Sequence, residues 1–221
     1  MALKREDILA GHIEEQVKEA ERLGLTKRLP PEQREASKQA ILEAIGENEI
    51  WLFGYGSLMW NPCIHYLDRQ PALLHGFHRN FCLRAPTGRG SPERPGLMLA
   101  LKNGGSCRGI VYQIDPAIAD QELSIVWDRE MISGAYQPRL LKLTTPLGQK
   151  QAIAFVINRQ HPRFIPHIEL SEAASMIAHA EGWLGTCAEY LFSTVEHLDE
   201  LGVADGPMHE LKRLVEQCQQ S

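Results

Sequence analysis

Hydrophobic positions change their spacing near residue 50. Before that point, residues 1–48 are rich in Glu, Lys, Gln and Ala and contain no aromatic residue. Two helices are predicted there: one ends at Gly24, and a second opens at Pro30-Pro31 and runs towards Ile45 and Gly46. The first is indicated by apolar residues at helical spacing, namely Leu9, Ile13, Val17 and Ala20. We therefore expect a helical N-terminal extension over 1–48 and one further domain over 49–221.

From Trp51 onward the apolar runs are short and are separated by Gly and Pro, which is typical of strands and turns. Asn103-Gly104-Gly105 is predicted to form a hairpin turn between the third and fourth strands, and Pro146–Gln149 one between the last two. The expected strands are Trp51 to Phe53, part of Ala72 to Leu83, Leu97 to Leu101, Gly109 to Ile114, Arg139 to Thr144 and Ala152 to Ile157.

Helical patterns resume between and after these strands. They cover Ala117 to Met131, Ser171 to Glu181 and the C-terminus from Ala188, where Gly202 to Pro207 interrupts the pattern. This order favours an α+β fold with a curved, mainly antiparallel sheet over alternating βαβ units.

Composition narrows the possible partners. The 221 residues are 43% hydrophobic, and 28 acidic against 23 basic residues give a net charge of -5, which argues against a nucleic-acid partner. No leader-like or membrane-spanning run is evident, so we expect a soluble cytoplasmic protein with no membrane partner. The cysteines never form C-x-x-C and are odd in number, which fits a reducing compartment; they are Cys63, Cys82, Cys107, Cys187 and Cys218.

The segment Gly54-Tyr-Gly-Ser-Leu58 is the first candidate site. A dinucleotide loop would need glycine at position 59, where Met59 stands, and no G-K-[ST] follows, so neither nucleotide motif is met. A strand ending in such a turn can direct successive backbone N–H groups at a carboxylate or an oxyanion. The alternative is an ordinary glycine-containing turn.

Glu130 is the second candidate. Asp115 and Pro116 favour a helix start, and in that register Glu130 ends an apolar stripe formed by Ala119, Leu123 and Val126. Burial and the helix dipole would then raise the pKa of this carboxyl and make it a proton acceptor near neutral pH. The alternative is a solvated glutamate at a frayed helix end.

Other chemistry has less support. His75 and His78 have no third ligand near them in sequence, so no metal site is expected. Cys63 and Cys82 have no local base, and the glycine that a nucleophile elbow needs after Ser57 is missing.

Together these residues resemble the ChaC-type γ-glutamylcyclotransferases, which cleave glutathione, and the match to bacterial members is close. The resemblance spans about residues 50 to 192, and the turn followed at a distance by Arg-Glu is a specific combination. Gly88–Ser91 and Ser133–Tyr136 depart from the family's usual pattern. The matching residues are Phe53–Pro62, Gly76–Arg84, Arg89-Gly90, Pro95-Gly96, Trp127–Met131 with Gly134 and Tyr136, and Gly185–Phe192.

The resemblance implies a small β-barrel with surrounding helices, glutathione as substrate and a catalytic acid/base at Glu130. It also implies a substrate-binding loop formed by Gly54, Tyr55, Gly56, Ser57, Leu58 and Met59. No cofactor is expected, because the amine and carbonyl that react belong to one molecule. Activity on other γ-glutamyl compounds and a binding module without turnover remain alternatives. Candidates for recognising the cysteinylglycine half are Arg84, Arg89, Tyr112, Tyr136 and Tyr190.

Overall fold

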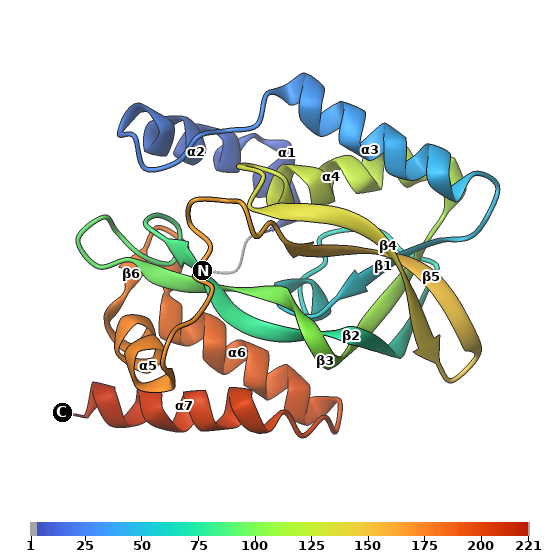
Figure 1. Cartoon of the computed structure of the whole chain (residues 1–221). Helices are drawn as coiled ribbons and strands as arrows, with labels where there is room; N and C mark the ends of the chain where they lie inside the picture. Colours follow the sequence, from blue (N-terminus) through green and yellow to red (C-terminus); the bar gives the residue numbers. More distant parts are fainter. Residues whose placement is uncertain (1–3, 221) are drawn as a thin grey trace. The chain divides into compact units, whose positions relative to one another are not determined.

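The computed structural model describes residues 4–220, which divide into two compact units (Figure 1). Among the described residues, the barrel unit combines 4–79 with Leu101–Asn158, and the C-terminal unit combines Asn80–Ala100 with 159–220. Strands β2 and β3 contribute residues to both units. The predicted domain boundary at residue 48 follows the change in composition and stays a prediction.

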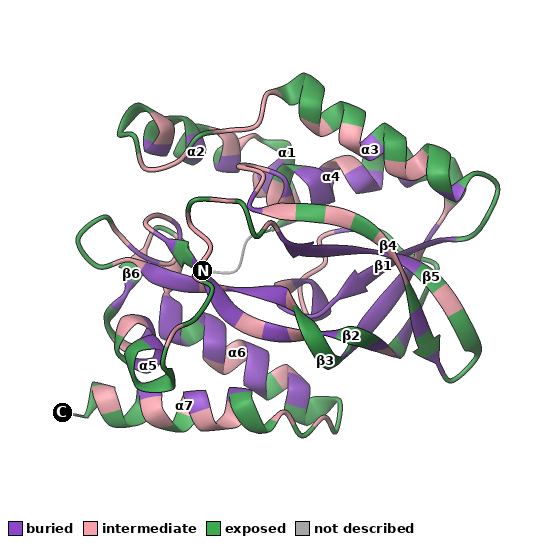
Figure 2. Cartoon of the chain, viewed as in Figure 1, coloured by how far each residue is buried: buried purple, intermediate pink, exposed green. Residues whose placement is uncertain are grey.

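The barrel unit contains a closed, mainly antiparallel barrel with strand order β1-β3-β2-β4-β5 (Figure 1). β1 pairs antiparallel with β3, β2 with β4 and β4 with β5, and a parallel contact between Leu52 and Ile153 joins β1 to β5. The ordering is closed, so each barrel strand has a neighbour on both sides, and β1 is buried along its whole length (Figure 2). The expected fold class is confirmed. The strands are β1 Ile50–Gly54, β2 Asp68–Ala85, β3 Gly96–Ile114, β4 Tyr136–Thr145 and β5 Gly148–Ile157.

One predicted hairpin is confirmed and the other is wrong. Thr145 pairs with Gly148 across the β4–β5 turn. Asn103–Gly105, in contrast, lies inside β3, which is one continuous strand. Gly104 and Gly105 have φ of 100° and 67°, and such left-handed glycines also occur where a strand bends or bulges. The dipeptide pattern alone does not distinguish a bend within a strand from a turn between strands.

The N-terminal helices are α1 Arg5–Leu9, α2 His12–Arg22 and α3 Pro31–Ile45. The first predicted helix is therefore two helices, because Gly11 takes the left-handed conformation with φ of 80° between them. Leu9 was expected on the apolar face but is 58% exposed, whereas Ile8 is buried. The other expected positions, Ile13, Val17 and Ala20, are buried as predicted.

Helix α4, Ala119–Glu130, follows a 3-10 turn, η2 Pro116–Ile118. The Asp115 carboxylate accepts the Ala117 N–H at 2.9 Å, so the predicted cap is confirmed, although it opens the 3-10 turn rather than the α-helix. The predicted stripe of Ala119, Leu123 and Val126 is buried.

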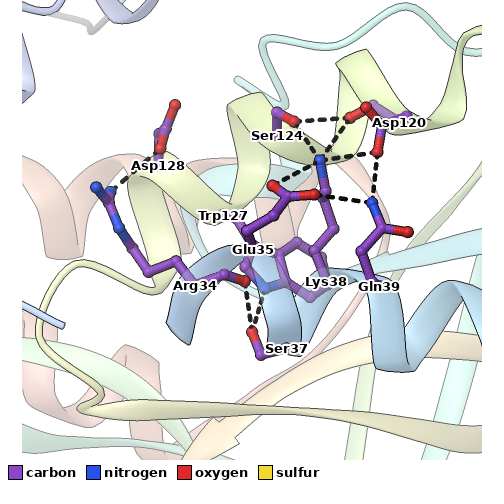
Figure 3. Close-up of polar contacts among 9 residues, drawn as sticks. All are labelled: Arg34, Glu35, Ser37, Lys38, Gln39, Asp120, Ser124, Trp127 and Asp128. Atoms are coloured by element: carbon purple, nitrogen blue, oxygen red, sulfur yellow. Dashed lines mark hydrogen bonds and ion pairs between the residues drawn. The ribbon is translucent and has the colours of Figure 1, made fainter. Parts of the chain in front are cut away.

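Helices α3 and α4 lie side by side (Figure 1) and are joined by a polar network (Figure 3). The Lys38 ammonium is buried and donates to the Ser124 hydroxyl at 2.6 Å; it also pairs with Asp120 at 2.9 Å and Glu35 at 3.1 Å. The Trp127 indole N–H donates to the Ser37 hydroxyl at 2.7 Å.

The C-terminal unit contains three helices that pack on one another. The predicted helices are confirmed here, and the expected break after α6 is present, although α7 already begins at Gly206. Each of these helices shows a buried stripe opposite exposed positions (Figure 2). The elements are α5 Leu170–His179, β6 Glu181–Gly182, β7 Gly185–Thr186, α6 Cys187–Glu200 and α7 Gly206–Gln219. Among residues 4–220, no helix is both long and apolar enough to cross a membrane.

Candidate active site

The turn after β1 is tightly built. β1 ends at Gly54 and a 3-10 turn, η1 Ser57–Met59, follows two residues later. The Met59 N–H donates to the Gly56 carbonyl at 2.8 Å, which closes the turn. A Cβ at Gly54 would lie 2.9 Å from the carbonyl carbon of Leu58, so only glycine fits at the strand end.

Three successive backbone donors of this turn are available. In the described part of the chain, the N–H groups of Gly56, Ser57 and Leu58 have no hydrogen-bond acceptor. Ser57 is partly exposed, while Gly56 and Leu58 are buried. Unpaired N–H groups at the start of a helical turn favour an anionic ligand, as expected for a carboxylate nest.

Side chains from the barrel hold this turn in place. The Tyr112 hydroxyl donates to the Met59 carbonyl at 2.7 Å, and the buried Arg79 guanidinium donates to the Tyr55 carbonyl at 3.1 Å. The Tyr55 hydroxyl itself donates to the Phe155 carbonyl at 2.9 Å. Burial raises the pKa of Tyr112, so its hydroxyl stays protonated and remains a donor. The turn is therefore anchored on both sides of its free N–H groups.

Arg129 joins the turn to the end of α4. Its guanidinium donates to the Asn61 carbonyl at 2.7 Å, the Pro62 carbonyl at 3.1 Å and the Ser57 hydroxyl at 3.3 Å. Glu130 is the next residue and the last of the helix. The structure thus brings the two sites predicted from the sequence to the same region of the barrel unit.

Glu130 differs electrostatically from an ordinary surface glutamate. The residue is partly exposed, yet burial raises the pKa of its carboxyl, and the opposing effect of the Arg129 charge is smaller. Within residues 4–220 the carboxylate accepts no hydrogen bond and forms no ion pair. The expected direction of the pKa shift is confirmed. A carboxylate of raised pKa without a partner is suited to accept a proton.

Glu122, which the sequence did not single out, is the most deeply buried carboxylate of α4. Both terminal nitrogens of Arg5 donate hydrogen bonds to this carboxylate, at 2.6 and 2.7 Å, and the His65 N–H donates to it at 2.8 Å. Burial by itself raises the pKa of Glu122, but these hydrogen bonds outweigh burial and lower it. Glu122 follows Ala119 by three residues and precedes Val126 by four, a helical spacing that indicates burial on the same face, whereas nothing in the pattern identifies Arg5 as its partner.

The residues proposed for the cysteinylglycine half fall in both units. Tyr112 and Tyr136 belong to the barrel unit, and Arg84, Arg89 and Tyr190 to the C-terminal unit. Arg89 donates to the Thr186 carbonyl at 3.0 Å, and its guanidinium lies 5.9 Å from the centre of the Tyr190 ring. These contacts have a structural role within the C-terminal unit, and the assignment to substrate stays a prediction.

The described residues offer no obvious metal centre. Between residues 4 and 220, no group of three or more His, Cys, Asp or Glu side chains is placed to hold an ion. In the part of the chain that the structure describes, no cysteine forms a disulfide.

Comparison with solved structures identifies the fold of the protein. The fold matches the crystal structure of a yeast γ-glutamylcyclotransferase specific to glutathione with a TM-score of 0.72 at 20% identity, covering 77% of this chain and 97% of that one. This similarity defines the γ-glutamylcyclotransferase fold.

Sequence comparison identifies the family. The model of the ChaC-like protein family matches residues 50–218, and the chain belongs to this family. It is 42% identical over 182 residues to the glutathione-specific γ-glutamylcyclotransferase of Escherichia coli, covering 81% of this chain and 79% of that protein. The protein of the same name from Schizosaccharomyces pombe is 27% identical, with 74% of this chain and 89% of that protein covered.

Proposed function

We propose that this protein is a glutathione-specific γ-glutamylcyclotransferase, which converts glutathione to 5-oxoproline and cysteinylglycine. The names of the relatives support the substrate. The observation that supports the chemistry is the set of Arg129 hydrogen bonds. They join the turn, whose N–H groups at Gly56–Leu58 have no acceptor among the described residues, to the helix end at Glu130, a glutamate of raised pKa that has no partner there either.

The proposed reaction is a ring closure within the γ-glutamyl unit. Its α-amino nitrogen attacks its own γ-carbonyl carbon, the bond from that carbon to the cysteinyl nitrogen breaks, and 5-oxoproline is formed. Well-oriented ring closures reach effective molarities on the order of 10⁵ M, so the protein needs no cofactor to supply reactivity. An amine of pKa about 8 is only about one tenth neutral at pH 7, so a base is needed.

The free N–H groups of the turn would bind the α-carboxylate of the glutamyl unit and hold its chain folded back for attack. Glu130 would take the ammonium proton and return it to the leaving nitrogen, acting first as base and then as acid. The N–H groups could instead stabilise the oxyanion of the tetrahedral intermediate. The proposed substrate-binding residues are Gly54, Tyr55, Gly56, Ser57, Leu58 and Met59.

The test is incubation of the purified protein with reduced glutathione. We expect 5-oxoproline and cysteinylglycine to form in equal amounts, and γ-glutamyl amino acids and γ-glutamylamines assayed in parallel to react more slowly. Faster turnover of those compounds would contradict the specificity. Glutathione that raises the melting temperature but is not consumed would instead indicate a binding module.

We propose a cytoplasmic location and no nucleic-acid partner. Cysteines that form no disulfide within residues 4–220 fit a reducing compartment, and the net charge of -5 disfavours binding to a phosphate backbone. Cell fractionation with an antibody to the protein tests the location; recovery in an oxidising compartment would contradict it.

A further inference from the structure

The five residues Asn61–His65, here called the post-loop segment, leave the substrate-binding loop and are held by two arginines. Arg129, from α4, donates to the carbonyls of Asn61 and Pro62. Arg5, from α1, donates to the carbonyl of Cys63 at 2.9 Å. Three successive carbonyls, which begin two residues after Met59, therefore each accept a hydrogen bond from a guanidinium.

The middle of the post-loop segment has an unfavourable backbone conformation. Among the described residues, Cys63 is the one non-glycine residue with positive φ, at 57°. A side chain disfavours this left-handed region, so the conformation persists only where the surroundings hold it. The hydrogen bond from Arg5 to the Cys63 carbonyl helps to hold Cys63 in this conformation.

Glu122 fixes the position of Arg5. Its buried carboxylate accepts both terminal nitrogens of the Arg5 side chain, which is 19% exposed. The same carboxylate accepts the N–H of His65, at the other end of the post-loop segment. A bidentate pair of this kind fixes the direction of the guanidinium, so Arg5 meets the Cys63 carbonyl in a defined geometry.

Arg5 lies outside the residues that the family model matches, 50–218, on a helix that contacts α4. Together, these contacts point to a role for the N-terminal helices in substrate binding. We infer that Arg5 is a positioning residue, which acts from α1 through the Cys63 carbonyl to hold the substrate-binding loop in its binding geometry. This inference rests on the proposed function.

Loss of Arg5 should affect substrate binding more than the chemical step. Glu130 keeps its place on α4 and Arg129 keeps its own bonds to the loop, so the proton transfer is preserved. A loosened loop, in contrast, loses affinity for the glutamyl carboxylate. We expect KM for glutathione to rise on the order of tenfold and kcat to change by less than about threefold, since small displacements of binding groups are costly.

The main variant is Arg5→Gln/Glu122→Gln, which removes the guanidinium without leaving a charged carboxylate buried and unpaired. A second variant, Arg5→Lys, keeps a positive charge beside Glu122. A single ammonium cannot form both the bidentate pair with Glu122 and the hydrogen bond to the Cys63 carbonyl. The matched control is Arg28→Gln: Arg28 pairs with Glu14 and Glu21 in the same N-terminal segment and has no described contact with the loop. The readouts are kcat, KM, melting temperature and hydrogen exchange of residues 55–65.

We expect both Arg5 variants to show a higher KM and faster exchange of the post-loop segment, and Arg28→Gln to change only the melting temperature. An unchanged KM and unchanged exchange in a folded Arg5 variant would overturn the inference while leaving the proposed function intact. If the double variant does not fold, Arg5→Lys decides alone. A wild-type protein that forms no 5-oxoproline would contradict the proposed function, and the inference with it.

Discussion

At the residue scale, the carboxylates of α4 differ in their partners. Asp120 pairs with Lys38, Glu122 with Arg5 and Asp128 with Arg34. Glu130, in the same helix, has no hydrogen-bond or ion-pair partner among residues 4–220. Hydrogen bonds from Lys38 lower the pKa of Asp120, and those from Arg5 and His65 outweigh burial at Glu122, whereas burial raises the pKa of Asp128 despite the Arg34 charge. Within residues 4–220, Glu130 differs from all three in that no partner engages its oxygens, which suits proton transfer.

Glu130→Gln is expected to lower kcat by on the order of 10²-fold or more, because the amide cannot accept the ammonium proton. Steady-state kinetics of 5-oxoproline release measures this loss. The matched control is Asp128→Asn, two residues earlier on the same helix, where Asp128 pairs with Arg34 at 3.2 Å. A folded Glu130→Gln variant of near wild-type rate would exclude Glu130 as the base.

The raised pKa of Glu130 predicts the pH dependence of both rate and stability. The base must be ionised, so kcat/KM should fall as pH decreases, with a midpoint above the ordinary value of 4.5. The folded pKa lies above the unfolded one, so this group favours folding when protonated at low pH, and that contribution is lost as pH rises through the two values.

Glu130→Gln should therefore melt at the same or a higher temperature than the wild type at neutral pH. A pH–rate profile and melting curves over about pH 4 to 8 check both expectations. An acidic limb with a midpoint at or below 4.5, or a clearly lower melting temperature of Glu130→Gln at pH 7, would contradict the assigned shift.

At the element scale, α3 and α4 are joined by a charge that is buried while its partners are exposed. The Lys38 side chain is 2% exposed, whereas Glu35 and Asp120 are 55% and 69% exposed. Burial lowers the pKa of Lys38, but the hydrogen bonds and charges of these two carboxylates together raise it by more than burial lowers it. The net shift is upward, so the ammonium stays charged. Its partners can return to water if the ammonium is removed, unlike a buried carboxylate such as Glu122.

Lys38→Met should therefore change the free energy of unfolding by less than about 1 kcal/mol, because the methionine fills the space of the aliphatic stem. Lys38→Ala leaves a cavity and should cost about 2 kcal/mol or more. Urea unfolding of the two variants measures the difference. Equal losses in both would mean that the ammonium, not the packing of the stem, joins the helices.

At the scale of the whole molecule, the N-terminal helices belong to the barrel unit. Their buried side chains include Ile8, Ile13 and Val17. The Leu29 N–H donates to the Ile132 carbonyl, just after α4, at 2.8 Å. The N-terminal helices therefore share one compact unit with the barrel, and the domain boundary at residue 48 stays a prediction.

A chain of residues 49–221 is expected to fold with a lower melting temperature and to turn over glutathione less efficiently, because it loses this packing and Arg5. Thermal melting and kcat/KM of the truncated and full chains provide the test. Stability and kinetics equal to those of the full chain would show that the helices are dispensable. Failure to fold would contradict a domain boundary at residue 48.

Much of the fold and of the candidate site could be predicted from spacing. Apolar periodicity located the strands and the face of α4 on which Glu130 lies, because burial of side chains repeats with the geometry of each element. The predicted Asn103–Gly105 hairpin was wrong because a left-handed glycine fits both a turn and a strand bend. The resemblance of Gly54–Met59 to a known loop identified the turn but not the side chains that hold it.

By itself, the sequence determined the glycine turn, the helix register that brings Glu130 to the end of an apolar stripe, and the α+β class. Only the tertiary structure decided that Arg129 joins this helix to the turn, that Arg5 and Glu122 hold the segment after it, and that Glu130 has no partner among residues 4–220. The physical reason is the distance in sequence between the partners. Periodicity shows which face of its own helix or strand a residue occupies. These contacts join residues far apart in the chain, and only the packing of the elements determines which residues meet.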